Sequence, residues 1–304
     1  MKNKVLIGSL AATLVAFILY SANLRRINNA SIKVITPSSS KIIKNKKAQK
    51  RQEPQLGTVE YSNHIKIAKG SNRELAGAIK SAMGLDDSYQ VAVQDLRSDK
   101  FARVANTTKT HQVTGTAKLF LLAAIYYQEQ TGRFNPHTVI KITKADRVKG
   151  EKFLQKGMMY GVTYLRQAMM RGNRTAANAF VRKIGPKKIT AFLHKLGATD
   201  TTVFVRSKQL RATTTAVDLN KVMVGLYHGK VLNRQYSDLA LSLIRSTKFK
   251  IQLTKNLPAN VCALGDGNSA VALVQSARRV YCVAVWCEHD NNFKNLGSSV
   301  NKML

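Results

Sequence analysis

The residues best placed for chemistry lie at the start of a long apolar segment, TGTAKLFLLAAIYYQEQ, which has the spacing of a helix from about residue 115 to residue 130. Lys118 lies near the N-terminal end of this helix, where burying its charge is costly without a partner. A nucleophile three residues earlier would share a helix face with the lysine, but Gly115 occupies that position. The segment therefore offers a lysine suited to proton transfer and no serine for it to act on.

Two threonines flank the position of the missing hydroxyl. Thr114 lies four residues before Lys118 and would share its side of the helix if the helix began that early. A threonine in this position is more typical of a helix N-cap, whose oxygen accepts a backbone hydrogen bond. Thr116 points about 200° away from Lys118 around the helix. Thr114 is therefore the alternative nucleophile, and capping is its competing role.

The sequence contains no pattern that indicates a metal ion or another cofactor. Its six histidines form no recognisable dyad, and only His111 comes close to the start of the predicted helix. The three cysteines are an odd number without a Cys-x-x-Cys pair, which argues against a disulfide framework. Cys282 and Cys287 lie five residues apart in a predicted strand, so we expect them on opposite faces as buried thiols.

The net charge is the outlying feature of the composition. Among 304 residues, 49 are Lys or Arg and 16 are Asp or Glu, which gives a formal charge of +33, while 44% are hydrophobic. This apolar content is enough for a folded core, and the length fits one large domain with appendages. The positive field would attract polyanions, among them anionic lipid, phosphate-rich wall polymers and nucleic acid.

Residues 1–24 predict a membrane anchor or a cleaved signal peptide. The apolar run from Val5 to Tyr20 reaches the roughly 20 residues of a transmembrane helix when it is counted on to Leu24. Cleavage after Ala22 would place Tyr20 where a small residue is normally needed, so an uncleaved signal-anchor is favoured. Basic residues are more numerous after the run than before it, which favours the opposite orientation by the positive-inside rule.

Residues 25–69 predict a flexible basic tether. Nine Lys or Arg and no acidic residue occur between Arg25 and Arg51, with Ser, Asn and Gln between them. A spacer kept soluble by its charge is one role, and binding to phosphate groups of a membrane or wall is the other. After residue 51 the chain still holds 38 of the 49 basic residues and all 16 acidic ones.

The apolar periodicity orders the globular part, residues 70–304. Helices are predicted near 72–85, 115–130, 163–172, 174–185, 186–198, 213–230, 233–246 and 291–304, and strands near 89–98, 100–109, 260–265, 269–277 and 278–288. A loop-rich stretch covers 132–157 and an irregular one 199–212. This order predicts an α+β fold, in which a five-stranded antiparallel sheet is built from both chain ends and a helical subdomain of about residues 112–248 is inserted.

This architecture, with a lysine at the start of the first long inserted helix, resembles the class A β-lactamase and penicillin-binding (DD-peptidase) family over roughly residues 70–304. Its best local support is DRVKGEKFLQKGMMYGVTYLRQAMMRGNRTAANAFVRKIG, where Thr175, Ala176 and Asn178 keep the family's T-A-x-N. The resemblance implies a serine acyl-transfer site made of three motifs, Ser-x-x-Lys, Ser-Asp-Asn and Lys-Thr-Gly. In that chemistry the serine attacks an acyl carbonyl and a nearby base takes its proton.

Every one of these motifs is altered in this sequence. The corresponding residues are Gly115-Thr116-Ala117-Lys118 on the helix, Gly172-Asn173-Arg174 on the loop and Ala263-Leu264-Gly265 on the strand. Where β-lactamases carry a deacylating glutamate, VRSKQLRAT supplies Ser207 and Lys208 but no acid. Four such changes together indicate a site that no longer meets the demands of acyl transfer.

The resemblance also places Arg174 near Lys118. Two cations in one cleft repel each other, which would lower the pKa of the lysine or draw an anion between them. Lys118 and Arg174 are therefore candidate anion-binding residues. Retention of Lys118 for packing and for hydrogen bonds to loop carbonyls is the alternative.

These observations predict a membrane-tethered, extracytoplasmic, β-lactamase-like protein that is non-catalytic and binds anionic cell-wall material or membrane phosphate groups. A peptidoglycan-like ligand is included in that class. The first alternative is an active serine-type hydrolase that acts on a β-lactam or a D-alanyl peptide with Thr114 as a substituted nucleophile. The second is a cytosol-facing polyanion binder, with nucleic acid as the disfavoured partner. We expect the cell membrane as the location, or secretion if the N-terminal segment is cleaved.

Overall fold

The computed structural model describes residues 65–85, 87–247, 251–257, 260–289 and 292–304, all within one compact unit of residues 61–304. The predicted anchor, residues 1–24, and the predicted tether as far as residue 64 lie outside the described residues. In the part of the chain that is described, none of the helices has both the length and the apolar character needed to cross a bilayer.

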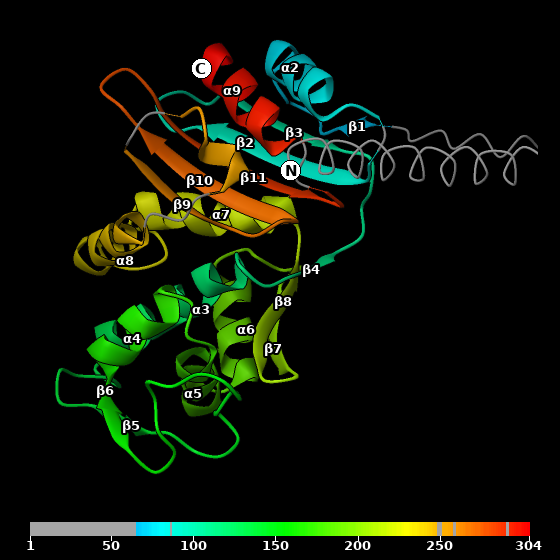
Figure 1. Cartoon of the computed structure of the whole chain (residues 1–304). Helices are drawn as coiled ribbons and strands as arrows, with labels where there is room; N and C mark the ends of the chain where they lie inside the picture. The colour runs from blue at the N-terminus through cyan, green and yellow to red at the C-terminus, as the bar shows by residue number, and fades with distance from the viewer. Residues whose placement is uncertain (1–64, 86, 248–250, 258–259, 290–291) are drawn as a thin grey trace, which may run out of the picture. The chain divides into compact units, whose positions relative to one another are not determined.

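A six-stranded antiparallel sheet forms one layer of the domain (Figure 1). In spatial order its strands are β1 (Lys66–Ile67), β3 (Phe101–Ala105), β2 (Tyr89–Asp95), β11 (Val280–Cys287), β10 (Ser269–Gln275) and β9 (Val261–Gly265). The predicted α+β fold and its five strands from both chain ends are confirmed. The sixth strand, β1, pairs with β3 at the sheet edge, in residues predicted as tether. Two residues are too few to show a strand pattern in the sequence.

Two hydrophobic clusters cover the two faces of this sheet. Along β2, Val91 and Val93 belong to one cluster and Ala92 to the other, as the alternation of a strand requires. The helices α2 (Arg73–Met83) and α9 (Phe293–Met303) pack together on the first face, and α7 (Ala216–Tyr227) covers the second (Figure 1). On β11, Cys282 and Cys287 fall in different clusters as buried free thiols, which confirms the prediction from their spacing.

The chain between β4 (His111–Val113) and α8 (Arg234–Ser246) forms the inserted helical part. Its other helices before α7 are α3 (Ala117–Gln130), α4 (Val162–Met170), α5 (Arg174–Ile184) and α6 (Pro186–Lys195), and the short 3-10 helix η1 (Gln252–Thr254) follows α8. Every side chain of α3 from Leu119 to Tyr126 is buried. A helix that is apolar all round belongs at the centre of a domain, and this one carries Lys118 at its start.

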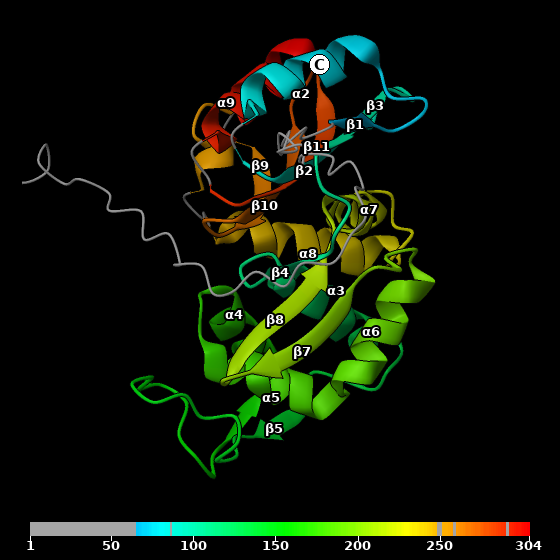
Figure 2. The same ribbon diagram turned by 90° about the vertical axis from the view of Figure 1, so that its right-hand side faces the viewer.

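Residues 199–212 were predicted to be irregular, and that prediction is wrong. They form the hairpin of β7 (Thr202–Arg206) and β8 (Gln209–Thr214), which pairs with β4 and lies against α5 and α6 (Figure 2). The turn escapes recognition because Ser207 and Lys208 have positive φ angles of 52° and 56°, which usually select Gly or Asn. The Lys208 ammonium holds the turn by donating to two backbone carbonyls of the loop after β5, at 2.8 and 3.3 Å. A further pair, β5 (Val139–Lys141) and β6 (Met159–Gly161), flanks that loop.

Candidate functional site

A cavity of about 270 Å³ lies at the N-terminal end of α3. Its walls are Thr114, Gly115, Lys118, Gly172, Asn173, Arg174, Ala177, Gln209, Leu210, Gly265 and Asp266. The structure therefore brings parts of all three altered motifs to one cavity. Of the strand motif only Gly265 reaches it, because Ala263 and Leu264 are buried in the two hydrophobic clusters.

Gly115 leaves no space for a side chain. A Cβ atom at this position would lie 2.6 Å from the carbonyl oxygen of Gly265 and 3.0 Å from the Cβ atom of Asp266. Ordinary van der Waals contact begins at 3.4 Å, so the end of β9 packs directly on the backbone before α3. The position that lacks a nucleophile in the sequence is closed to one in the structure.

The Asp266 carboxylate joins the turn after β9 to the start of α3. Its Oδ2 atom accepts from the Thr114 and Gly115 amides at 3.3 and 2.6 Å and from the Thr114 hydroxyl at 2.7 Å. Its Oδ1 atom accepts from the Asn268 and Ser269 amides at 3.1 and 2.9 Å and from the Ser269 hydroxyl at 3.1 Å. Both oxygens are thus fully engaged by the protein.

These hydrogen bonds decide the charge state of Asp266. Burial alone would raise the pKa of the carboxyl, but the hydrogen bonds, beginning with that from the Thr114 hydroxyl, outweigh burial and hold the pKa below its usual value. Asp266 was not among the residues predicted from the sequence. The Asp-Gly-Asn triplet after a predicted strand indicates a turn, but the contact with Thr114 spans 152 residues and leaves no local pattern.

Thr114 has a different position from that predicted. The helix begins at Ala117 and its N-cap is Thr116, so Thr114 neither shares a helix face with Lys118 nor caps α3. The Thr114 hydroxyl instead donates to Asp266. The Thr116 hydroxyl is fully buried and shares a 2.8 Å hydrogen bond with the hydroxyl of Ser269. Thr114 therefore joins the start of α3 to the turn after β9, and Thr116 joins it to the first residue of β10.

Lys118 is half-buried on the first turn of α3 and faces the cavity. Burial lowers the pKa of the lysine, and the negative charge of Asp266 opposes this effect. The direction agrees with the sequence-based hypothesis, which attributed the shift to repulsion by Arg174. The principal cause is desolvation.

A second carboxylate organises the altered loop motif before α5. Asn173 is the N-cap of α5, and its side-chain oxygen accepts from the Ala176 amide at 2.8 Å. Glu151 accepts from the Arg174 and Thr175 amides, both at 2.9 Å, and forms an ion pair of 3.4 Å with the Arg174 side chain. A carboxylate at this place is favoured by the helix dipole. Arg174 thus reaches the same cavity as Lys118, with Glu151 as a partner that the sequence analysis did not identify.

The remaining wall comes from the hairpin, where Gln209 and Leu210 face the cavity. Ser207 and Lys208, which correspond in the sequence to the family's glutamate-bearing loop, form the hairpin turn and are not part of the wall. The Asn178 amide of T-A-x-N donates to the Lys208 and Asp146 carbonyls, both at 3.0 Å. Over the described residues, no group of three His, Cys, Asp or Glu side chains is arranged to hold a metal ion.

Comparison with known proteins identifies relatives over the same region. The family described as "Beta-lactamase enzyme family" matches residues 72–302. The chain is 27% identical over 200 residues to Beta-lactamase CARB-3 and 26% identical to Beta-lactamase PSE-4, both of Pseudomonas aeruginosa, over 60% of this chain and 67% of each relative.

Solved structures show the same fold at lower identity. A beta-lactamase from Sphaerobacter thermophilus DSM 20745 has a TM-score of 0.62 and 16% identity, over 75% of this chain and 92% of that one. The structure of PBP-A has a TM-score of 0.66 and 14% identity, over 76% of this chain and 95% of that one.

Proposed function

This chain belongs to the beta-lactamase enzyme family, and within that family we propose that it is a binding protein that forms no acyl-enzyme. Its ligand is an anionic group of cell-wall material, such as a phosphate or carboxylate, held in the cavity beside Lys118 and Arg174. A membrane-tethered, extracytoplasmic location belongs to the same proposal.

The closure of position 115 carries this proposal. Serine acyl transfer needs a hydroxyl on the helix face of Lys118, and a side chain at Gly115 would meet the Gly265 carbonyl oxygen at 2.6 Å. This obstacle is backbone, so no rotation of a side chain removes it.

The backbone donors that an acyl-transfer site needs are also engaged. A tetrahedral intermediate is stabilised by N–H groups aimed at the developing oxyanion. Here the Thr114 and Gly115 amides donate to the Asp266 carboxylate, and the Asp266 amide donates to the Ser269 carbonyl at 2.8 Å. A substrate oxyanion would have to displace a carboxylate that already has the same charge.

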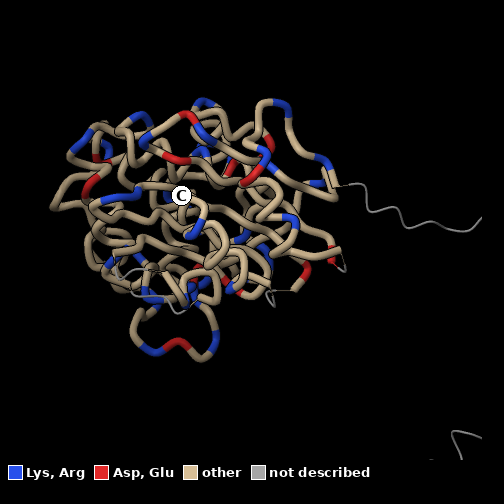
Figure 3. Tube along the Cα trace, turned by 90° about the horizontal axis from the view of Figure 1, so that it is seen from above, with Lys and Arg blue, Asp and Glu red and all other residues tan. Residues whose placement is uncertain are grey.

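The charge of the protein supports an anionic ligand. Lys118 and Arg174 line the cavity with one carboxylate, Asp266, which already accepts hydrogen bonds at both oxygens, while Glu151 pairs with Arg174 at 3.4 Å. Lys and Arg are also distributed over much of the described chain, with fewer Asp and Glu (Figure 3). Such a field raises the local concentration of an anionic polymer before it reaches the cavity.

One observation favours a hydrolase as the second candidate. The Thr114 hydroxyl lies 2.7 Å from the Asp266 carboxylate in the same cavity as Lys118, an arrangement of nucleophile and base. The lowered pKa of Asp266 makes it a weak base, however. Its occupation of the neighbouring amides also leaves them unavailable to an oxyanion. We therefore favour binding.

A fluorescent penicillin separates the two functions. We expect no covalent labelling of the purified full-length chain under conditions that label a serine β-lactamase. Labelling that disappears in Thr114→Ala would establish the hydrolase instead.

Calorimetric titration with glycerol-phosphate oligomers tests the ligand. We expect Lys118→Ala and Arg174→Ala each to weaken binding about tenfold or more, the scale of a hydrogen bond to a charged group, while Lys302→Ala on α9 does not. Equal binding by all of these variants would exclude the cavity as the site. Protease access to a C-terminal tag on intact cells distinguishes an extracytoplasmic domain from a cytosol-facing polyanion binder.

A further inference from the structure

Exposed apolar side chains gather around the strand pair β5–β6. In the described part of the chain ten large hydrophobic residues are strongly exposed, and five of these lie between residues 139 and 164. They are Val139 (50% exposed), Phe153 (80%), Met158 (54%), Met159 (63%) and Tyr164 (50%), and we call them the apolar patch. A concentration of exposed apolar groups on a folded domain marks an interaction surface, whereas single ones are ordinary.

Strand pairing and ring contacts join the patch into one region. The register of β5 and β6 puts Val139 and Met159 on the same face of the strand pair. The Tyr160 hydroxyl donates to the Phe153 carbonyl at 3.3 Å, and the Tyr160 ring stacks on Tyr164 with 5.8 Å between ring centroids. Tyr160 is adjacent to Met159 and so points to the other face of the strand pair. The apolar patch therefore surrounds the strand pair, with Val139 and Met159 on one face and Phe153 and Tyr164 beside Tyr160.

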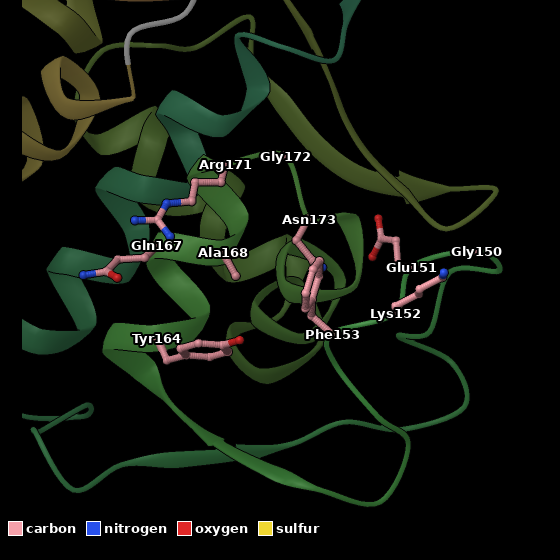
Figure 4. Close-up of a pocket in the computed structure, with 10 residues that line it drawn as sticks. All are labelled: Gly150, Glu151, Lys152, Phe153, Tyr164, Gln167, Ala168, Arg171, Gly172 and Asn173. Carbon is pink, nitrogen blue, oxygen red and sulfur yellow. The ribbon is translucent and has the colours of Figure 1, made fainter.

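A hollow of about 550 Å³ lies beside Phe153 and Tyr164. Phe153 borders it from the loop after β5, Tyr164 and Gln167 border it from α4, and Arg171 borders it from the end of that helix (Figure 4). Phe153 and Tyr164 give the hollow aromatic walls, which suit the apolar part of a ligand, and Glu151, Lys152 and Arg171 are the charged residues that line it.

The loop beside the patch is strongly cationic. Five exposed lysines, Lys141, Lys144, Lys149, Lys152 and Lys156, lie on β5 and the loop after it. The two carboxylates of the same stretch are engaged within the protein. Asp146 has a side chain only 2% exposed and pairs with Arg182, and Glu151 binds the amides at the start of α5. The lysine charges therefore face outward without neutralisation by these two carboxylates.

We propose that the apolar patch and these five lysines form a docking surface for anionic lipid bilayers. The apolar side chains enter the interface between headgroups and acyl chains, and the lysines pair with lipid phosphates. A soluble polyanion would gain nothing from Phe153 or Met159, and a neutral apolar partner would gain nothing from the lysines. The combination favours a lipid surface, and it does not depend on the proposed function of the Lys118 cavity.

Vesicle co-sedimentation tests this surface. The sample is residues 61–304, a compact unit that contains every described helix and strand and both hydrophobic clusters, with cooperative thermal unfolding as the check that it folds. We expect binding to vesicles of phosphatidylcholine mixed with phosphatidylglycerol, weakened by salt, and little binding to phosphatidylcholine alone. Equal binding to both kinds of vesicle would overturn the role of charge.

Paired variants separate the apolar and the charged contributions. The double variant Phe153→Ser and Met159→Ser should weaken partitioning about tenfold or more, and each of Lys152→Glu and Lys156→Glu should weaken it about fivefold or more. The matched controls are Leu239→Ser with Met303→Ser, and Lys294→Glu with Lys302→Glu, which are exposed residues of the same types elsewhere.

Two results would refute the docking surface. One is wild-type partitioning by all patch variants. The other is a combination of two observations: the Phe153→Ser and Met159→Ser double variant binds vesicles as the wild type does, and soluble polyphosphate abolishes vesicle binding. That combination would make the surface a polyanion site. We expect the patch variants to bind glycerol phosphate as the wild type does. A loss of vesicle binding in these variants can then be attributed to the docking surface and not to the cavity beside Lys118.

Discussion

Replacement of Gly115 by alanine should destabilise the protein, because one methyl group must enter space that backbone atoms already occupy. The Cβ atom would lie 2.6 Å from the Gly265 oxygen and 2.7 Å from the Gly265 carbonyl carbon. Gly265 has little freedom to withdraw, because it pairs with Ala270 in the sheet, and a Cβ atom built on Gly265 would itself lie 2.8 Å from the Ser269 carbonyl oxygen. Relief of the contact requires β9 and α3 to separate.

The expected loss combines two contributions. Overpacking of a well-packed site costs about 1–3 kcal/mol. Separation of β9 from α3 also weakens the hydrogen bonds from the Thr114 and Gly115 amides to the Asp266 carboxylate, and a bond to a charged group contributes about 1.5–3 kcal/mol. We expect a total near 3 kcal/mol, which corresponds to a fall in Tm of roughly 6–12 °C for a domain of this size.

Thermal and urea unfolding followed by circular dichroism measure this loss. Gly77→Ala is the matched control, because Gly77 is an exposed residue inside α2 and a Cβ atom there would meet nothing within 4 Å. That substitution should stabilise the protein by about 0.5–1 kcal/mol through helix propensity alone. The two glycine-to-alanine changes are therefore expected to have opposite signs.

A Gly115→Ala protein as stable as the wild type would refute the closure of this position. So would a folded Gly115→Ser protein that is labelled by a fluorescent penicillin, since labelling requires both the serine and an open pair of amide donors. A destabilised and unlabelled Gly115→Ser protein is the expected result.

Three further substitutions test the neighbouring groups. Asp266→Asn should lower the free energy of unfolding at pH 7 by roughly 2–4 kcal/mol. Because folding lowers the pKa of Asp266, the stability that its charged form contributes is present above about pH 4 and is lost as the pH falls through the folded-state pKa. Urea titrations should therefore show that the wild type and the variant differ less in unfolding free energy at acid pH. Burial lowers the pKa of His111 to about 4, so the stability that depends on its neutral form should decline as the pH falls from about 6.5 towards 4. His111 stacks on Trp286, the only tryptophan, with 3.2 Å between ring centroids, so the fluorescence should titrate near pH 4 and His111→Gln should abolish that transition. Asn173→Ala should cost about 0.5–2 kcal/mol in thermal unfolding through loss of the α5 cap.

The helices were predictable from the sequence because their signals are local. The segments that became α4, α5 and α6 combine apolar faces at helical spacing with terminal signals, among them Gly185 and Pro186 between α5 and α6. The N-cap of α7 is Thr215, whose hydroxyl accepts from the Asp218 amide at 3.2 Å. Such patterns lie within one or two turns of the chain and do not depend on the rest of the fold.

The candidate site was predictable only in part. The altered motifs located Lys118, Arg174 and Gly265, but not the two carboxylates that organise them. Asp266 contacts residues about 150 positions earlier, and Glu151 contacts the start of α5 across 23 positions. A single acidic residue in a loop carries no periodic signal, so only the tertiary structure shows that each binds the backbone next to a helix start.

The same contacts bear on why Lys118 is retained. Sites kept open for catalysis are often costly to stability. Here the Asp266 carboxylate accepts hydrogen bonds from the Thr114 and Gly115 amides, which precede α3. Burial lowers the pKa of Lys118, which means that its charged form pays a desolvation cost in the folded protein. If packing alone retained the lysine, Lys118→Met would keep the side-chain volume and remove the desolvation cost of the ammonium. The variant would then be as stable as the wild type or more stable, and its response to anions would not change. If the cavity binds an anion, the same variant should no longer respond to glycerol phosphate in a thermal-shift assay. A Lys118→Met protein that keeps the wild-type thermal shift would assign the lysine to packing.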